Sequence, residues 1–147
     1  MDKSETLLAL EKAKILHQNQ MDKIEQLLAG ENVDTPTPIG KMECECGQWF
    51  YEVQDEMHKI LGAQLFTKLD ELHEKWHSEY VKIYDIFFKE KKKGFFAKLT
   101  GANKINPLEQ DRAKLYFSEL KETTNLLFSA SDIAMRRVAA LSDTKFR

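Results

Sequence analysis

Three histidines occupy positions at which a buried helical stripe would normally be apolar. His17 interrupts one stripe of residues spaced three and four apart, and His73 interrupts another. His77 follows His73 by four residues, so both imidazoles project from one helix face, one turn apart. A single such histidine is more often a hydrogen-bonded core residue than a ligand. Three that converge in an apolar interior favour a divalent metal ion, which would satisfy all three at once.

Cys44 is the natural fourth ligand for such an ion. It lies in the first turn of a predicted second helix, where the helix terminus favours the thiolate that a metal binds. The alternative is that Cys44 is a small buried hydrophobic residue. Three imidazole nitrogens and one thiolate form a closed tetrahedral set, which suits Zn²⁺ above all. The sequence therefore predicts a Zn²⁺ site of His17, Cys44, His73 and His77, with no open position for an activated water.

Two tryptophans lie near these ligands in the sequence. Trp49 follows Cys44 by five residues, and Trp76 lies between His73 and His77. Their rings would shield the ion from water and orient the imidazoles around it. Packing of the bundle interior is an equally reasonable role for both tryptophans, and the two roles are compatible.

Four helical segments would position these side chains. Their apolar stripes run over residues 7–28, 46–60, 66–87 and 117–141. Asp2 or Ser4 suits the N-cap of the first helix, and Asn106 suits that of the fourth, which begins with Pro107. Gly62 marks the break between the second and third helices. Because no alternating β-type run is present, we expect an all-α, antiparallel four-helix bundle that forms a single domain over residues 1–147.

A long loop at residues 30–42 separates the first two predicted helices. It has 13 residues, including two prolines and two glycines, whereas connections in helical bundles usually take about 2–8. His17 lies about 18 Å from the end of the first helix, at about 1.5 Å per residue. An extended loop of this length can return the chain to that height. The loop is therefore predicted to bring Cys44 level with His17.

The residues of this predicted site resemble the chemoreceptor zinc-binding (CZB) domain family. The family pattern is a histidine, then Cys-x-apolar-Gly-x-Trp, then a His-x-x-x-His pair. Here that pattern falls on His17, Cys44, Gly47, Trp49, His73 and His77. The motif-bearing part covers about residues 10–85, while the basic connection 89–106 and the C-terminal helix 107–141 carry no motif. Cys46 departs from the family, which has a larger apolar residue at that position.

This resemblance implies a Zn²⁺-binding helical domain in the cytoplasm. Members of the family are commonly attached to bacterial chemoreceptors or diguanylate cyclases, where they sense zinc or oxidants and often dimerise. We therefore expect a regulatory domain, not an enzyme, that acts in chemotaxis or cyclic-di-GMP signalling through a homodimer or a signalling partner. Oxidant sensing would use Cys44, with Cys46 as a resolving thiol, although residues two apart on a helix face different sides.

A zinc hydrolase is a competing interpretation. His73 and His77 with Glu74 between them spell HExxH, in which Glu74 would act as the general base. Such enzymes usually have uncharged residues between the histidines, whereas Lys75 is charged. They also need a further downstream ligand and an open coordination position, and the sequence shows neither.

A di-iron bundle and a metal-free helical interaction module also compete with the zinc site. Glu74 and His77 match half of a di-iron Glu-x-x-His pattern, whose mate would be Asp55 with His58. His58 lies off the apolar stripe, which favours a surface position. The metal-free module requires the stripe histidines to be hydrogen-bonded core residues.

Composition excludes several further classes of function. The chain has 22 basic and 24 acidic residues and a net charge of −2, so no overall field would attract nucleic acid. No apolar run reaches the roughly 18–20 residues that a membrane span needs, and the N-terminus lacks a signal-peptide pattern. We therefore expect a cytoplasmic protein without membrane insertion. The lysine-rich stretch at 89–98 is predicted to be a solvated loop, although it could instead contact an acidic partner, an anionic membrane or RNA.

Overall fold

The computed structural model describes residues 1–33, 40–89 and 106–146, and every regular element in these ranges is helical. In chain order the elements are α1 (Lys3–Leu28), α2 (Glu45–Glu52), α3 (Gln54–Leu61), α4 (Ala63–Tyr84), the π-helical turn η1 (Asp85–Lys89), α6 (Pro107–Ala140) and the 3-10 turn η3 (Asp143–Lys145). The all-α prediction is confirmed. The basic connection at 89–106 falls almost entirely outside the described residues.

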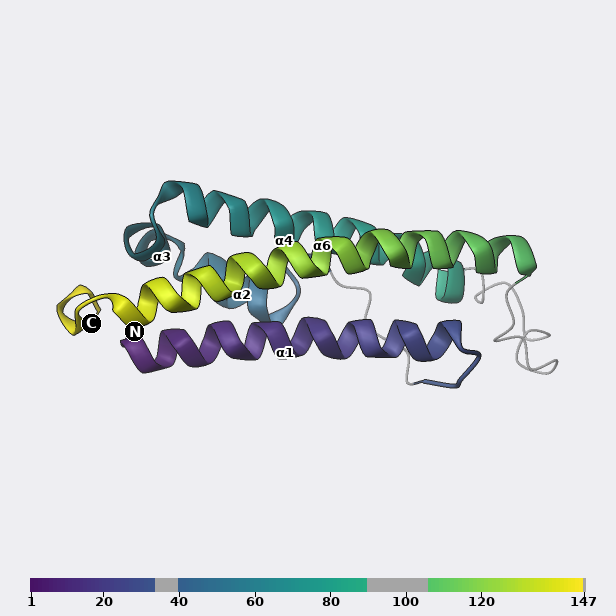
Figure 1. Ribbon diagram of the computed structural model, residues 1–147, viewed down its shortest axis with the longest axis horizontal. Helices are drawn as coiled ribbons and strands as arrows, with labels where there is room; N and C mark the ends of the chain where they lie inside the picture. Colours follow the sequence, from purple (N-terminus) through teal and green to yellow (C-terminus); the bar gives the residue numbers. More distant parts are fainter. Residues whose placement is uncertain (34–39, 90–105, 147) are drawn as a thin grey trace.

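Three long helices dominate the molecule. Figure 1 shows α6 between α1 and α4, with both chain termini at the same end. Side-chain contacts fix the direction of the first pair, because Gln110 Nε2 donates to the Leu28 carbonyl at one end (3.0 Å) and Lys3 Nζ donates to the Leu141 carbonyl at the other (2.7 Å). Helices α1 and α6 therefore run antiparallel.

The single second helix that the sequence predicts is divided in two. Val53 (φ −105°, ψ 21°) ends α2 and begins α3, so the described chain has five α-helices where four were expected. Phe50 before the break and Ile60 after it are both buried, so each short helix keeps an apolar side on the core. The predicted break at Gly62 is confirmed, because its φ of +83° lies in the left-handed region that glycine adopts readily.

Predicted helix ends agree with the structure. Asp2 caps α1 in a reciprocal capping box with Glu5, in which each side chain accepts the other residue's backbone N–H. Asn106 caps α6 by accepting from Glu109 N–H at 2.8 Å, and Pro107 opens that helix. These local contacts satisfy N–H groups that a helix terminus otherwise leaves without partners.

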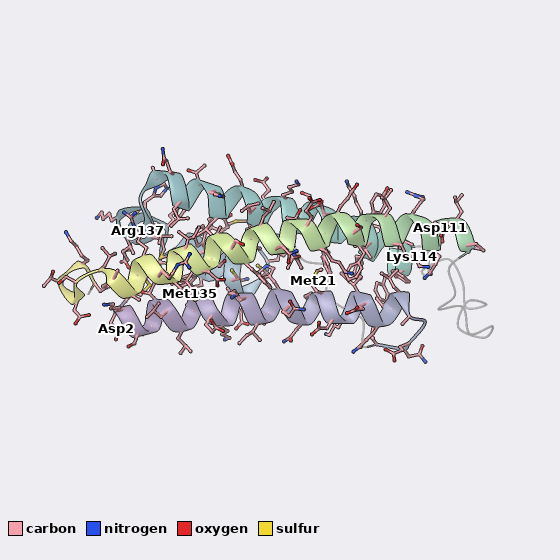
Figure 2. All side chains as sticks on the ribbon, viewed as in Figure 1. Asp2, Met21, Asp111, Lys114, Met135 and Arg137 are labelled. Atoms are coloured by element: carbon pink, nitrogen blue, oxygen red, sulfur yellow. The ribbon has the colours of Figure 1, made fainter. Side chains whose placement is uncertain are left out.

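Side chains from α1 and α4 meet α6 in the core. Met21, labelled in Figure 2, points from α1 to the Thr124 hydroxyl, which lies 3.4 Å from the Met21 sulfur. From α4, the Trp76 indole N–H donates to the same hydroxyl at 2.9 Å. Thr124 in turn donates to the Leu120 carbonyl. One buried residue of α6 thus contacts both neighbouring helices at the height of the predicted ligands.

A helix that crosses a membrane must be both long and apolar. None of the helices within residues 1–33, 40–89 and 106–146 combines the length and the apolar character that a bilayer span requires.

Candidate metal centre

Four side chains from three helices meet in the interior. His17 comes from α1, Cys44 from the start of α2, and His73 and His77 from α4. One donor atom from each lies within 4.8 Å of all the others, and each residue is at most 6% exposed. Tetrahedral zinc, with bonds of about 2.0–2.3 Å, places its donor atoms about 3–4 Å apart. The structure thus brings together all four residues that the sequence singles out, at separations that small adjustments would close.

The His17 ring is oriented by its own helix. Its Nδ1 lies 2.7 Å from the Ala13 carbonyl, which can only accept, so Nδ1 carries the proton. The other nitrogen, Nε2, is buried and has no hydrogen-bond partner within the part of the chain that the structure describes. A buried nitrogen without a partner is costly, and it is the donor that a metal ion would use.

The other three potential ligand atoms, on His73, His77 and Cys44, lie close together. His73 Nε2 lies 2.9 Å from His77 Nε2 and 3.3 Å from Cys44 Sγ. Because one ring nitrogen of His73 faces two potential ligands at once, a single proton cannot satisfy every contact. A cation shared by the three groups would satisfy them together.

Cys44 is held as an acceptor at the start of α2. It is the N-cap of α2, directly before the first turn in which the sequence predicts it. Its sulfur accepts the Gly47 backbone N–H at 3.1 Å. The neighbouring Cys46 thiol, and further the hydrogen bonds from His73 and His77, lower the pKa of Cys44. The same interaction raises the pKa of Cys46. Of the two thiols, Cys44 is the one that the structure favours as a thiolate, because its sulfur also accepts the Gly47 N–H.

Trp76 packs directly on the cluster. It is 1% exposed and meets the rings of His17 and His77 edge-on, at centroid distances of 4.6 Å and 4.9 Å. Trp49 is half-buried and lines a cavity of about 40 Å³ together with His17 and His73. The two tryptophans thus lie on the helices beside the cluster, Trp76 in contact with two of its rings.

A pocket of about 260 Å³ lies against His17, Cys44 and His77. The exposed residues Glu43 and Glu45 form part of its wall, so the pocket extends to the surface of the molecule. The cluster is therefore buried but can be approached from solution on this side.

His17 gives the metal-free protein a predictable response to acid. Burial lowers its pKa from 6.5 to about 4, because the charged imidazolium is disfavoured in the interior. Between these values the unfolded chain takes up a proton that the folded chain does not, so stability falls as the pH falls. We expect a loss of about 3 kcal/mol from this group between roughly pH 7 and pH 4, measured by urea unfolding.

The His17→Gln variant is the control for this prediction. It lacks the titrating ring, so its unfolding free energy should fall less steeply with acid than that of the parent protein. An equal slope in the two proteins would show that His17 is not the responsible group.

The residues of the competing hydrolase and di-iron sites lie elsewhere. Glu74 is exposed, and its carboxylate pairs with Lys41 Nζ at 3.3 Å, so it is not a member of the cluster. Asp55 and His58 are also exposed, and the His58 ring stacks on Phe66 with centroids 3.8 Å apart. Glu74, the general base that the HExxH pattern would use, thus lies outside the cluster, and Asp55 and His58 do not join it as the second half of a di-iron motif.

Sequence reasoning missed the contacts that hold the ligands in place. The Ala13 carbonyl lies four residues before His17, a spacing that helical geometry makes generally available. Lys41, Tyr51 and Asp70 form a polar group beside Cys44, and no motif in the sequence marks them. Their partners are distant in sequence, so only the folded structure reveals the group.

Comparison with known families agrees with this geometry. Residues 17–84 match the model of the family described as Chemoreceptor zinc-binding domain, a span that begins at His17 and includes Cys44, His73 and His77. The resemblance inferred from the motif is therefore confirmed for this segment. No curated protein and no solved structure matches the chain significantly.

Proposed function

Because residues 17–84 belong to the chemoreceptor zinc-binding domain family, we propose that this protein binds one Zn²⁺ ion through His17, Cys44, His73 and His77 as a regulatory domain. The convergence of these four buried donors is the observation that carries the proposal. When bound, the ion would supply the positive charge that neutralises the thiolate and satisfies the three imidazoles.

The protein's own residues suit regulation by metal. The ligands come from α1, the start of α2 and α4, so zinc would link three helices. A ligand shifts a conformational equilibrium only if it binds one state more tightly. Cys44 lies at a helix start, next to a pocket that reaches the surface, so its position is the one most easily altered when the ion leaves.

The proposal extends to the size of the domain, its location in the cell and its partners. We propose a single domain over residues 1–147, in which α2 and α3 together take the place of the second helix of an antiparallel four-helix bundle. The domain would act in the cytoplasm, in chemotaxis or cyclic-di-GMP signalling, as a homodimer or with a signalling partner. Oxidant sensing is a second candidate, favoured by the low pKa of Cys44 beside the Cys46 thiol.

Elemental analysis of the purified protein tests the site. Wild-type protein should contain about one zinc per chain, and His73→Ala or Cys44→Ala should lose most of it. His58→Ala is the matched control, because His58 is exposed and lies outside the cluster. Full zinc content in both ligand variants would end the proposal.

A further inference from the structure

Lys41 connects the turn before Cys44 to helix α4. Its ammonium nitrogen lies 3.3 Å from Glu74 Oε2 and 3.5 Å from Asp70 Oδ1, and its side chain is 26% exposed. The same nitrogen lies 5.4 Å from the centre of the Tyr51 ring, within cation–π range. Isolated ion pairs on a surface contribute little, but a partly buried cation with several partners is held more firmly.

Asp70 also contacts α2, through Tyr51. Its carboxylate accepts a hydrogen bond from the Tyr51 hydroxyl, so α2 and the turn that precedes it share one anchor on α4. Burial and the Asp70 carboxylate both raise the pKa of Tyr51, which keeps the hydroxyl protonated as a donor. The side chains of Lys41, Tyr51 and Asp70 thus contact one another beside the cluster.

The backbone of Lys41 touches the predicted sulfur ligand. Its carbonyl oxygen accepts from the Cys44 thiol at 3.5 Å. A thiolate cannot donate this hydrogen bond, so with zinc bound Lys41 would hold the turn through its side chain. On α4, Asp70 and Glu74 lie three residues before and one residue after His73. Through its backbone and its side chain, Lys41 thus spans the distance between the Cys44 turn and the helix that carries His73.

We propose that Lys41 is a positioning residue that holds Cys44 against His73, with Asp70, Glu74 and Tyr51 as its anchor, and so sets the lifetime of bound zinc. This inference rests on the proposed function, which it extends from the ligands to the residue that controls their exchange. Residues that orient metal ligands from outside commonly change affinity by about 10–100-fold when they are replaced.

The rate of zinc transfer to a coloured chelator measures this role. Lys41→Met should release zinc about tenfold faster than wild type, while the loaded protein still holds one ion. Lys41→Arg, which keeps the charge, should release zinc at close to the wild-type rate. Lys3→Met is the matched control, since it removes the same charge from a side chain of similar exposure (27%) whose partners, Asp143 and the Leu141 carbonyl, lie far from the Cys44 turn.

Cobalt substitution provides a readout that a general loss of stability would not imitate. The thiolate-to-cobalt absorption band depends on the placement of the sulfur, so it should shift or weaken in Lys41→Met and recover in Lys41→Arg. Tyr51→Phe, which keeps the ring but removes the hydroxyl that reaches Asp70, should also release zinc faster. It supplies a second variant if Lys41→Met does not fold.

The possible outcomes separate the two proposals. If wild-type protein contains no zinc, the proposed function fails, and the positioning role fails with it. If wild-type protein holds zinc and its release rate equals that of both Lys41→Met and Tyr51→Phe, only the positioning role is overturned. Equal acceleration by Lys3→Met would also overturn it, because the effect would then come from the loss of a charge and not from the Cys44 turn.

Discussion

Removal of zinc from the purified protein is expected to lower its melting temperature by about 10–15 °C. Ion binding at about a thousandfold excess over the dissociation constant stabilises the folded state by about 4 kcal/mol. A domain of this size changes its melting temperature by roughly 3–4 °C per kcal/mol. Without the ion, the buried His17 Nε2 has no hydrogen-bond partner among the described residues. The Cys44 thiolate also loses the positive charge that would balance it.

Scanning calorimetry of zinc-loaded, chelated and reloaded samples measures this effect. Reloading should restore the original transition, which separates metal loss from damage by the chelator. The His73→Ala variant should show no response to either treatment, because it lacks a ligand from the centre of the cluster. An unchanged melting temperature in wild type would favour the metal-free interaction module instead.

Helical periodicity was enough to find the histidines of this site. Residues four apart on a helix must share a face, so the pairing of His73 with His77 follows from local geometry alone. His17 stands out because it is polar in an apolar stripe. The expectation that Cys44 reaches it rests on the length of the segment at 30–42, of which residues 34–39 lie outside the described ranges. All four inferences depend on spacing along the chain, which a sequence shows directly.

The break at Val53 could not be predicted in the same way. No proline or glycine marks it, and the residues on both sides continue an apolar spacing of three and four. The contacts that accompany the break are tertiary, since Phe50 stacks on Phe66 of α4 with centroids 4.6 Å apart. Such packing overrides the continuous helix that local pattern favours.

The partners of polar residues on the helices could not be predicted from the sequence either. Lys14 interrupts the apolar stripe of the first helix, and the structure pairs it at 2.7 Å with Asp132, 118 residues away. Glu79 lies outside the stripe read from the sequence, yet it is buried on α4 and accepts a hydrogen bond from Thr123 of α6. A sequence indicates that such residues need partners, but the fold decides which partners they find.

Gly47→Ala is expected to disrupt the centre although it adds only one carbon. Replacing a helical glycine by alanine normally stabilises a helix by about 1 kcal/mol. Here an added Cβ would overlap the Lys41 carbonyl oxygen and lie 3.3 Å from Cys44 Sγ. The first contact is with backbone, so the turn that holds Cys44 must move. We expect a loss of about 3 kcal/mol in unfolding free energy and at least about tenfold weaker zinc binding.

Gly40→Ala makes the same chemical change seven residues earlier and is the matched control. Within the described residues, a Cβ at Gly40 would meet the Glu43 side chain alone, at 4.0 Å, so both properties should stay close to wild type. Urea unfolding and competition with a chelator of known affinity measure stability and zinc binding on the same samples. Because helix propensity and the steric clash predict opposite signs for Gly47→Ala, a more stable variant that keeps wild-type affinity would show that the Cys44 turn has room to move. The close approach of Lys41 to Gly47 would then have no part in placing the sulfur.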